Sequence, residues 1–285
     1  MKILFINNFN APDYLNDSVY HGLYCLNKKF PTEFQVTVSN RPGYMMKDYP
    51  DPENLYGRGF SLYAFMDDHL PVETDMIRKI QDRYYDLVIY GSILRDSTLI
   101  EEVFRSYRKD EILTFDGEDY HYIDEFLAYR TTYFKRENVL GRRDIRNTNF
   151  AIPEEKVFTR KFKKDKVLGT VIPGDTSTYL FSKEHDYYMD YATSHYGKTH
   201  KKGGWDCLRH YEIFAAYCIP YFSDIHLCPE QVLTNLPKNL LLEVNRYAVE
   251  GKVHPDYDNL LEEAHEYTLK YLTTEALATD RKSVV

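Results

Sequence analysis

The chain has 285 residues, of which 43% are hydrophobic and 28% charged, and its formal net charge at pH 7 is −8. This composition excludes a disordered chain, and the length exceeds the roughly 100 to 200 residues of one domain, which predicts two domains. No apolar run approaches the ~20 residues of a membrane helix, and neither a secretory leader nor a basic excess is evident. The sequence therefore predicts a cytoplasmic protein with no membrane span and no nucleic-acid partner.

Apolar runs in the first half predict successive strands of a doubly wound parallel sheet. They lie at 3–7, 34–38, 87–90 and 112–115, and helical or irregular stretches separate them. The segment 41–62 is rich in Pro, Gly, Tyr and Asp without a period, which predicts a long loop beside a cleft. We expect this first domain to cover residues 1–160.

Polar residues follow the first predicted strand, at the edge where open α/β sheets bind ligands. Asp13 is a candidate general base at this edge. Asp17 is better suited to cap a helix that continues to Leu26.

Carboxylates crowd the end of the strand at 112–115, in the sequence Asp116-Gly117-Glu118-Asp119. Repulsion between like charges can raise the pKa of one carboxyl, as a general base requires. The same cluster could bind a divalent cation or form a solvated turn. Lys135 and Arg136 follow nearby, and they either contact a ligand or pair internally with the acids.

The second half, residues 161–285, is predicted to contain strands at 167–172 and 239–244 and helices at 182–194 and 256–274. Thr178 lies in a hydroxyl-rich segment after the first of these strands, which could meet a sugar or a phosphate or be a plain loop. The four cysteines show no CxxC pairing, so we expect them to be reduced. No HExxH, zinc spacing or DxD triplet occurs, and we expect no metal site.

The sequence from 201 to 224, KKGGWDCLRHYEIFAAYCIPYFSD, predicts an anion-ready helix followed by a buried strand. Lys202, Gly203 and Gly204 lead into a helix expected over 204–216, whose free N–H groups could approach a phosphate. Arg209 and Glu212 lie on its polar side. An apolar run at 218–222 then predicts a parallel strand.

Arg209, Glu212 and the run Cys218-Ile219-Pro220 resemble the pattern of the exostosin-like family of GT-B glycosyltransferases. In that family an Arg, two further residues and a Glu precede a small-residue run that ends in Cys-Ile-Pro. The acidic turn and basic strand of the first half resemble the family more loosely, and Tyr217 stands where the family usually has Gly. The resemblance implies an α/β GT-B fold, with two Rossmann-like domains facing an interdomain cleft and a C-terminal helix that packs back.

The resemblance also implies an activity: inverting, metal-independent transfer of a sugar to a glycan acceptor held by the first domain. The donor would be a nucleotide-sugar co-substrate, expected to be UDP-linked, for example UDP-xylose, with no other cofactor. Glu212 would hold the ribose, and one of Asp13, Asp116, Glu118 and Asp119 would act as the base. The implied contacts to the rest of the donor are Lys135, Arg136, Thr178, Lys202, Gly203, Gly204 and Arg209.

Two alternatives from other classes stay open. A non-catalytic nucleotide-binding or glycan-binding protein would share the donor site but would need no base. A nucleotide-sugar-processing enzyme, such as an epimerase, would consume the donor without an acceptor.

Overall fold

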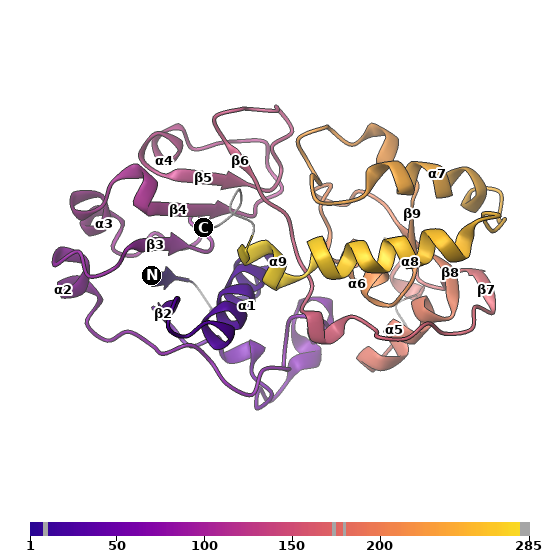
Figure 1. Cartoon of the computed structure of the whole chain (residues 1–285), viewed down its shortest axis with the longest axis horizontal. Helices are drawn as coiled ribbons and strands as arrows, with labels where there is room; N and C mark the ends of the chain where they lie inside the picture. The colour runs from indigo at the N-terminus through magenta and orange to yellow at the C-terminus, as the bar shows by residue number, and fades with distance from the viewer. Residues whose placement is uncertain (8–10, 173–174, 179–180, 280–285) are drawn as a thin grey trace.

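The computed structural model describes residues 1–7, 11–172, 175–178 and 181–279, and each half of the molecule is built around a parallel β-sheet (Figure 1). The first sheet has the strand order β2-β1-β3-β4-β5-β6, and the second has the order β7-β8-β9. The strands are β1 (Lys2–Ile6), β2 (Gln35–Val38), β3 (Leu87–Tyr90), β4 (Ile112–Asp116), β5 (Thr132–Lys135), β6 (Arg146–Asn147), β7 (Lys166–Leu168), β8 (Ser194–Thr199) and β9 (Ile219–Phe222). The predicted α/β class with parallel sheets is confirmed.

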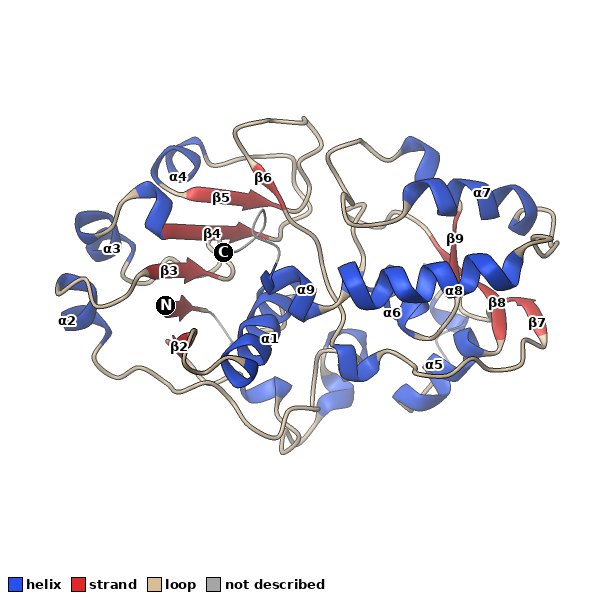
Figure 2. Cartoon of the chain, in the orientation of Figure 1, coloured by secondary structure: helices blue, strands red, loops and turns tan. Residues whose placement is uncertain are grey.

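Helices connect and cover these strands (Figure 2). They are α1 (Tyr14–Lys29), α2 (Met76–Gln81), α3 (Ile100–Ser106), α4 (Glu125–Arg130), α5 (Glu184–Ala192), α6 (Leu208–Ala215), α7 (Lys238–Ala248), α8 (Tyr257–Tyr267) and α9 (Thr274–Thr279). Strands β3 and β4 are buried along their whole length, as central parallel strands covered on both faces should be. The core therefore lies between the sheet and its helices.

Several predicted elements differ from the structure. The segment 239–244 belongs to helix α7 and is not a strand, since Leu240, Leu241, Val244 and Ala248 bury one helical face. The helix expected over 256–274 ends at Tyr267 and continues as a π-helical turn at Thr268–Leu272 before α9 begins. Strand β8 was not predicted, because its sequence SHYGKT has no apolar run.

The C-terminal helix returns to the first half of the chain. Helix α9 packs on α1, and a Cβ atom at Gly22 of α1 would overlap the carbonyl group of Thr274. Only glycine lets the two backbones approach this closely. The Ile152 N–H donates to the Leu272 carbonyl (3.0 Å), and the Thr274 N–H donates to the Ile152 carbonyl (2.9 Å). The segment joining the two sheets is therefore bonded to the C-terminal segment.

Strands β1 to β6 end at Asn147 and β7 begins at Lys166, so the predicted domain boundary at 160/161 falls between the two sheets and stays a prediction. Among the helices of the described residues, none has the length and apolar character needed to cross a membrane.

Candidate active site between the two sheets

A cavity of about 730 Å³ lies between the two halves of the chain. Its lining comes from the segments that follow β1 to β6 in the first sheet and from those that follow β7 and β8 in the second. Ligands in open α/β sheets bind at such strand ends. The predicted site residues that line it are Asp13, Glu118, Asp119, Arg136, Lys202, Gly203, Gly204, Arg209 and Glu212.

Asp13 lies where the strand order of the first sheet reverses, between β1 and β3. One carboxylate oxygen accepts from the N–H groups of Leu15 and Asn16, so Asp13 caps α1. The other oxygen accepts from Ser92 Oγ (2.6 Å) and lies 3.4 Å from Arg95 Nη1. Asp13 takes the capping position that the sequence assigned to Asp17, because the helix starts one turn earlier than predicted.

The acidic turn after β4 divides into a buried part and a cavity-facing part. Asp116 is 1% exposed and accepts from Tyr133 OH (2.6 Å) and Lys135 Nζ (2.8 Å). Asp116 and Lys135 are register partners on adjacent strands, which explains why they meet. Neither lines the cavity, in agreement with the internal ion-pair alternative and not with a base or a donor contact.

Glu118 and Asp119 point the other way, into the cavity. Glu118 Oε1 accepts from Arg95 Nε at 2.6 Å, and Asp119 pairs with Arg136. The sequence did not single out Arg95, since nothing in the segment after β3 marks it as a site residue. Its contacts to both Asp13 and Glu118 make it the centre of this side of the cavity.

Arg136 connects the two halves of the chain across the cavity. Its side chain is 2% exposed. It donates to the carbonyl groups of Gly117 (3.0 Å) and Asp206 (2.6 Å) and to Glu137 Oε1 (2.9 Å). Burial raises the pKa of the Asp206 carboxyl to about 7, although the Arg136 charge opposes that rise. Arg136 thus fixes the acidic turn against the loop before α6.

Glu212 lies on the opposite wall, within helix α6. Its Oε1 accepts from Ser61 Oγ (2.5 Å) and its Oε2 accepts from Tyr187 OH (2.6 Å). Burial raises the pKa of the Glu212 carboxyl, and these two hydroxyl donors act against the rise. Ser61 comes from the predicted long loop, of which Leu55, Tyr56, Gly57, Arg58 and Phe60 line the cavity. The predicted place of this loop beside the cleft is confirmed.

The glycines before α6 do not form its first turn. The helix begins at Leu208 with Cys207 as the N-cap, four residues later than predicted, since Trp205 and Asp206 are buried in the preceding loop. Cβ atoms at Gly203 and Gly204 would overlap the side chain of Asp119, so these glycines permit close contact between the two halves. Lys202 and Arg209 still face the cavity from the same side.

Thr178 lies outside the cavity, and Tyr217, where the family pattern usually has glycine, adopts a backbone conformation that glycine favours. Thr178 Oγ1 accepts from the Ile172 N–H (2.9 Å) and does not line the cavity, which matches the plain-loop alternative. Tyr217 has φ +54°, the left-handed conformation that glycine adopts most readily. Its ring stacks on His265 with centroids 3.9 Å apart, a contact that a glycine could not make.

Comparisons with known proteins give structural neighbours only. No protein-family model matches the sequence, and no curated protein matches it. Two similar solved structures are of an alpha-glucosyltransferase in complex with UDP and a 13-mer DNA. The structure whose DNA contains an HMU base has 11% sequence identity to this chain and a TM-score of 0.45. The structure whose DNA contains a central A:G mismatch has 10% identity and a TM-score of 0.47. A third is MurG of Acinetobacter baumannii, at 8% identity and TM-score 0.43. Each match covers 96% of this chain and 96% of the other, and similarity at this level identifies no activity.

The prediction that nucleic acid is excluded as a partner is wrong. It rested on the net charge of −8, whereas two of the similar structures hold DNA. Net charge averages over the whole chain, and it does not describe the charge around one cleft. The cavity lining carries both signs of charge: the basic residues are Arg58, Arg95, Arg136, Lys202 and Arg209, and the acidic residues are Asp13, Glu118, Asp119, Asp206 and Glu212.

Proposed function

We propose that the chain is a GT-B glycosyltransferase that moves a sugar from a nucleotide-sugar to an acceptor hydroxyl. The observation that carries this proposal is the interdomain cavity, which brings cations and Glu212 from the second half opposite carboxylates from the first. Its volume of about 730 Å³ is in the range of sites for small organic ligands.

The second half is suited to the donor. Lys202 and Arg209 face the cavity beside the α6 N-terminus, where cations and free N–H groups attract a diphosphate. Glu212 is held by two hydroxyl groups at a depth where a carboxylate can accept hydrogen bonds from ribose. These charges would stabilise the leaving diphosphate without a metal ion. The nucleotide is proposed to be UDP, and the sugar, for example xylose, is proposed only by resemblance to the exostosin-like family.

The first half would supply the base for an inverting reaction. All four candidate carboxylates pair with cations or hydroxyl groups, but the Asp116 and Asp13 side chains are only 0% and 8% exposed, whereas those of Glu118 and Asp119 are 22% and 51% exposed. Glu118 and Asp119 face the cavity on the loop after β4 and are therefore our proposed bases. One of them would take the proton of an acceptor hydroxyl whose oxygen attacks the sugar C1. The bond from C1 to the diphosphate oxygen then breaks, and its electron pair leaves with the diphosphate.

Calorimetric titration with UDP, GDP, CDP and their common sugar conjugates tests the donor site. We expect selective binding of one nucleotide, and we expect Arg209→Ala to weaken it. Arg143→Ala is the matched charge control, since Arg143 is exposed and does not line the cavity. Failure of every nucleotide to bind would refute the proposal.

Product analysis then separates the catalytic proposal from its alternatives. Incubation with the bound donor and an acceptor panel of oligosaccharides and oligonucleotides should release the nucleoside diphosphate and form a glycosylated product. We propose that the acceptor is a glycan. A glycosylated oligonucleotide among the products would instead identify nucleic acid as the acceptor. Donor binding without any product would show a binding protein, and a rearranged nucleotide-sugar would show an epimerase-type enzyme.

A further inference from the structure

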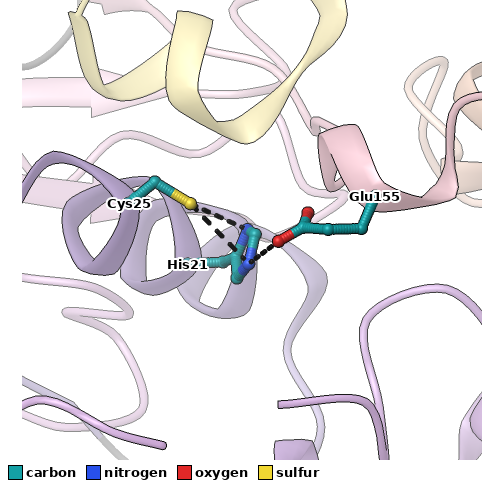
Figure 3. Close-up of side chains that lie close together, drawn as sticks. All are labelled: His21, Cys25 and Glu155. Carbon is teal, nitrogen blue, oxygen red and sulfur yellow. Dashed lines mark hydrogen bonds and ion pairs between the residues drawn. The ribbon is translucent and has the colours of Figure 1, made fainter. Parts of the chain in front are cut away.

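Three potential metal ligands gather where the two halves of the chain join. His21 and Cys25 lie one helical turn apart on α1, and Glu155 comes from a short helical turn in the segment between the two sheets (Figure 3). None of the three lines the interdomain cavity. No local sequence pattern indicates this group, because 130 residues separate Cys25 from Glu155.

The ligand atoms of this group lie close enough together to surround one metal ion. His21 Nε2 lies 3.7 Å from a Glu155 oxygen, and Cys25 Sγ lies 3.8 Å from Nε2 and 3.9 Å from Nδ1 of the same ring. The ligand atoms of the three residues lie within 4.8 Å of one another. A tetrahedral zinc ion with ligands ~2.0 to 2.3 Å away separates its ligand atoms by about 3.3 to 3.7 Å. Because the sulfur is as near to Nδ1 as to Nε2, the Cys25 side chain would rotate to bring the sulfur to the Nε2 side of the ring.

The orientation of the His21 ring is fixed from behind. Its Nδ1 lies 2.7 Å from Thr274 Oγ1, at the start of α9, so Nε2 is the nitrogen that faces Glu155. Metal-binding histidines are regularly held in this way through the other ring nitrogen.

The surrounding charges also favour a cation. Glu154, Glu155 and Glu275 contribute negative potential at Cys25, which Lys28 opposes. Lys156 is the neighbouring cation of His21, but its Nζ is engaged with Glu184 Oε2 at 2.7 Å.

We propose that His21 Nε2, Cys25 Sγ and a Glu155 oxygen bind one Zn²⁺ ion, with water as the fourth ligand. The mixed nitrogen, sulfur and oxygen ligands suit zinc and not Mg²⁺ or Ca²⁺, which prefer oxygen. The thiol loses its proton to solvent when the sulfur binds. The ion would tie α1 to the segment that leads into the second sheet, and through Thr274 it would also hold α9. This proposal is independent of the proposed transferase activity.

Competition of the chelator-treated full chain with a chromophoric chelator measures Zn²⁺ binding, and Co²⁺ serves as the spectroscopic probe. We expect one bound equivalent of Zn²⁺ and a thiolate-to-Co²⁺ charge-transfer band. Cys25→Ser should abolish the band and Glu155→Gln should weaken Zn²⁺ binding by about tenfold or more. Glu154→Gln is the matched control, since it changes a neighbouring carboxylate that is not in the group, and it should retain binding.

Lack of stoichiometric Zn²⁺ binding would overturn the proposal, as would unchanged binding in Cys25→Ser. The Glu155 side chain is 59% exposed, so its replacement should leave the fold intact and keep the test decisive. Unchanged Zn²⁺ affinity in a folded Glu155→Gln variant would also remove the site as drawn. Mg²⁺ binding with loss of the Zn²⁺ preference would refute the assignment of the metal.

Discussion

Replacement of Glu212 by Gln should weaken donor binding and stabilise the fold at the same time. Glutamine keeps the length of the side chain and can still hydrogen-bond to Ser61 and Tyr187, which now donate at 2.5 and 2.6 Å. It removes the negative charge that we propose for ribose binding. A hydrogen bond to a charged group contributes about 1.5 to 3 kcal/mol, which corresponds to a loss of ~10- to 150-fold in affinity.

The effect on stability follows from burial of the carboxyl. Its pKa is raised in the folded protein, so the folded state keeps a proton that the unfolded chain releases near its ordinary pKa of ~4.3. Stability contributed by this group therefore falls as pH rises above that value. Glutamine does not titrate, so the variant should match the wild type below pH ~4.3 and be more stable than the wild type at neutral pH.

Two measurements on one variant check these expectations. Calorimetry at neutral pH gives the nucleotide Kd, and denaturant unfolding across the acid-to-neutral range gives the stability. Glu263→Gln on the surface of α8 serves as the control for both. An unchanged nucleotide Kd would refute the role of Glu212 in binding, and lower stability at neutral pH would refute the electrostatic argument.

Other predictions concern stability and follow from single contacts. Burial raises the pKa of Asp17 to about 8, so the folded state holds a proton that the unfolded chain loses near pH ~3.9. The free energy of unfolding should therefore fall as pH rises between these two values. In denaturant unfolding, Asp17→Asn should flatten this slope by up to ~1.4 kcal/mol per pH unit. Arg136→Met should lower the free energy of unfolding by about 3 to 5 kcal/mol, because it leaves buried carboxylate and carbonyl acceptors unpaired. Arg143→Met is the control at an exposed position and should leave stability nearly unchanged. Gly22→Ala should lower the free energy of unfolding by about 1 to 3 kcal/mol, because its Cβ would separate α9 from α1. Gly43→Ala is the control, since a Cβ at Gly43 meets nothing within 4 Å and should leave stability unchanged. Equal unfolding midpoints for the two variants would contradict the close approach of the helices.

Strands that consist of short buried apolar runs could be predicted closely. Strand β3 coincides with its predicted range, and β1 and β9 differ from theirs by one residue. The strand predicted at 239–244 is a helix, because a short apolar run fits a buried strand and a buried helix equally well. Only buried positions beyond this run, such as Ala248, show the helical spacing.

The site could be predicted where one segment carries it and not where the fold assembles it. Arg209 and Glu212 are three residues apart on one helix, and this spacing alone predicts that they are neighbours on the helix surface. Ser61 reaches Glu212 across 151 positions of sequence, and nothing local marks it. Asp116 and Lys135 looked like site residues because sequence does not show which side of a strand end faces the sheet interior.

Sugar transfer is the reaction that the proposed function requires. The nucleotide-sugar selected by calorimetry should be incubated with the acceptor panel, and released nucleoside diphosphate and glycosylated product should be measured for the wild type, Glu118→Gln and Asp119→Asn. We expect equimolar release and transfer by the wild type, and a fall of roughly 100-fold or more in one of the two variants with donor binding retained. Full activity in both variants would contradict the proposed base, and absence of both donor binding and transfer in the wild type would contradict the function.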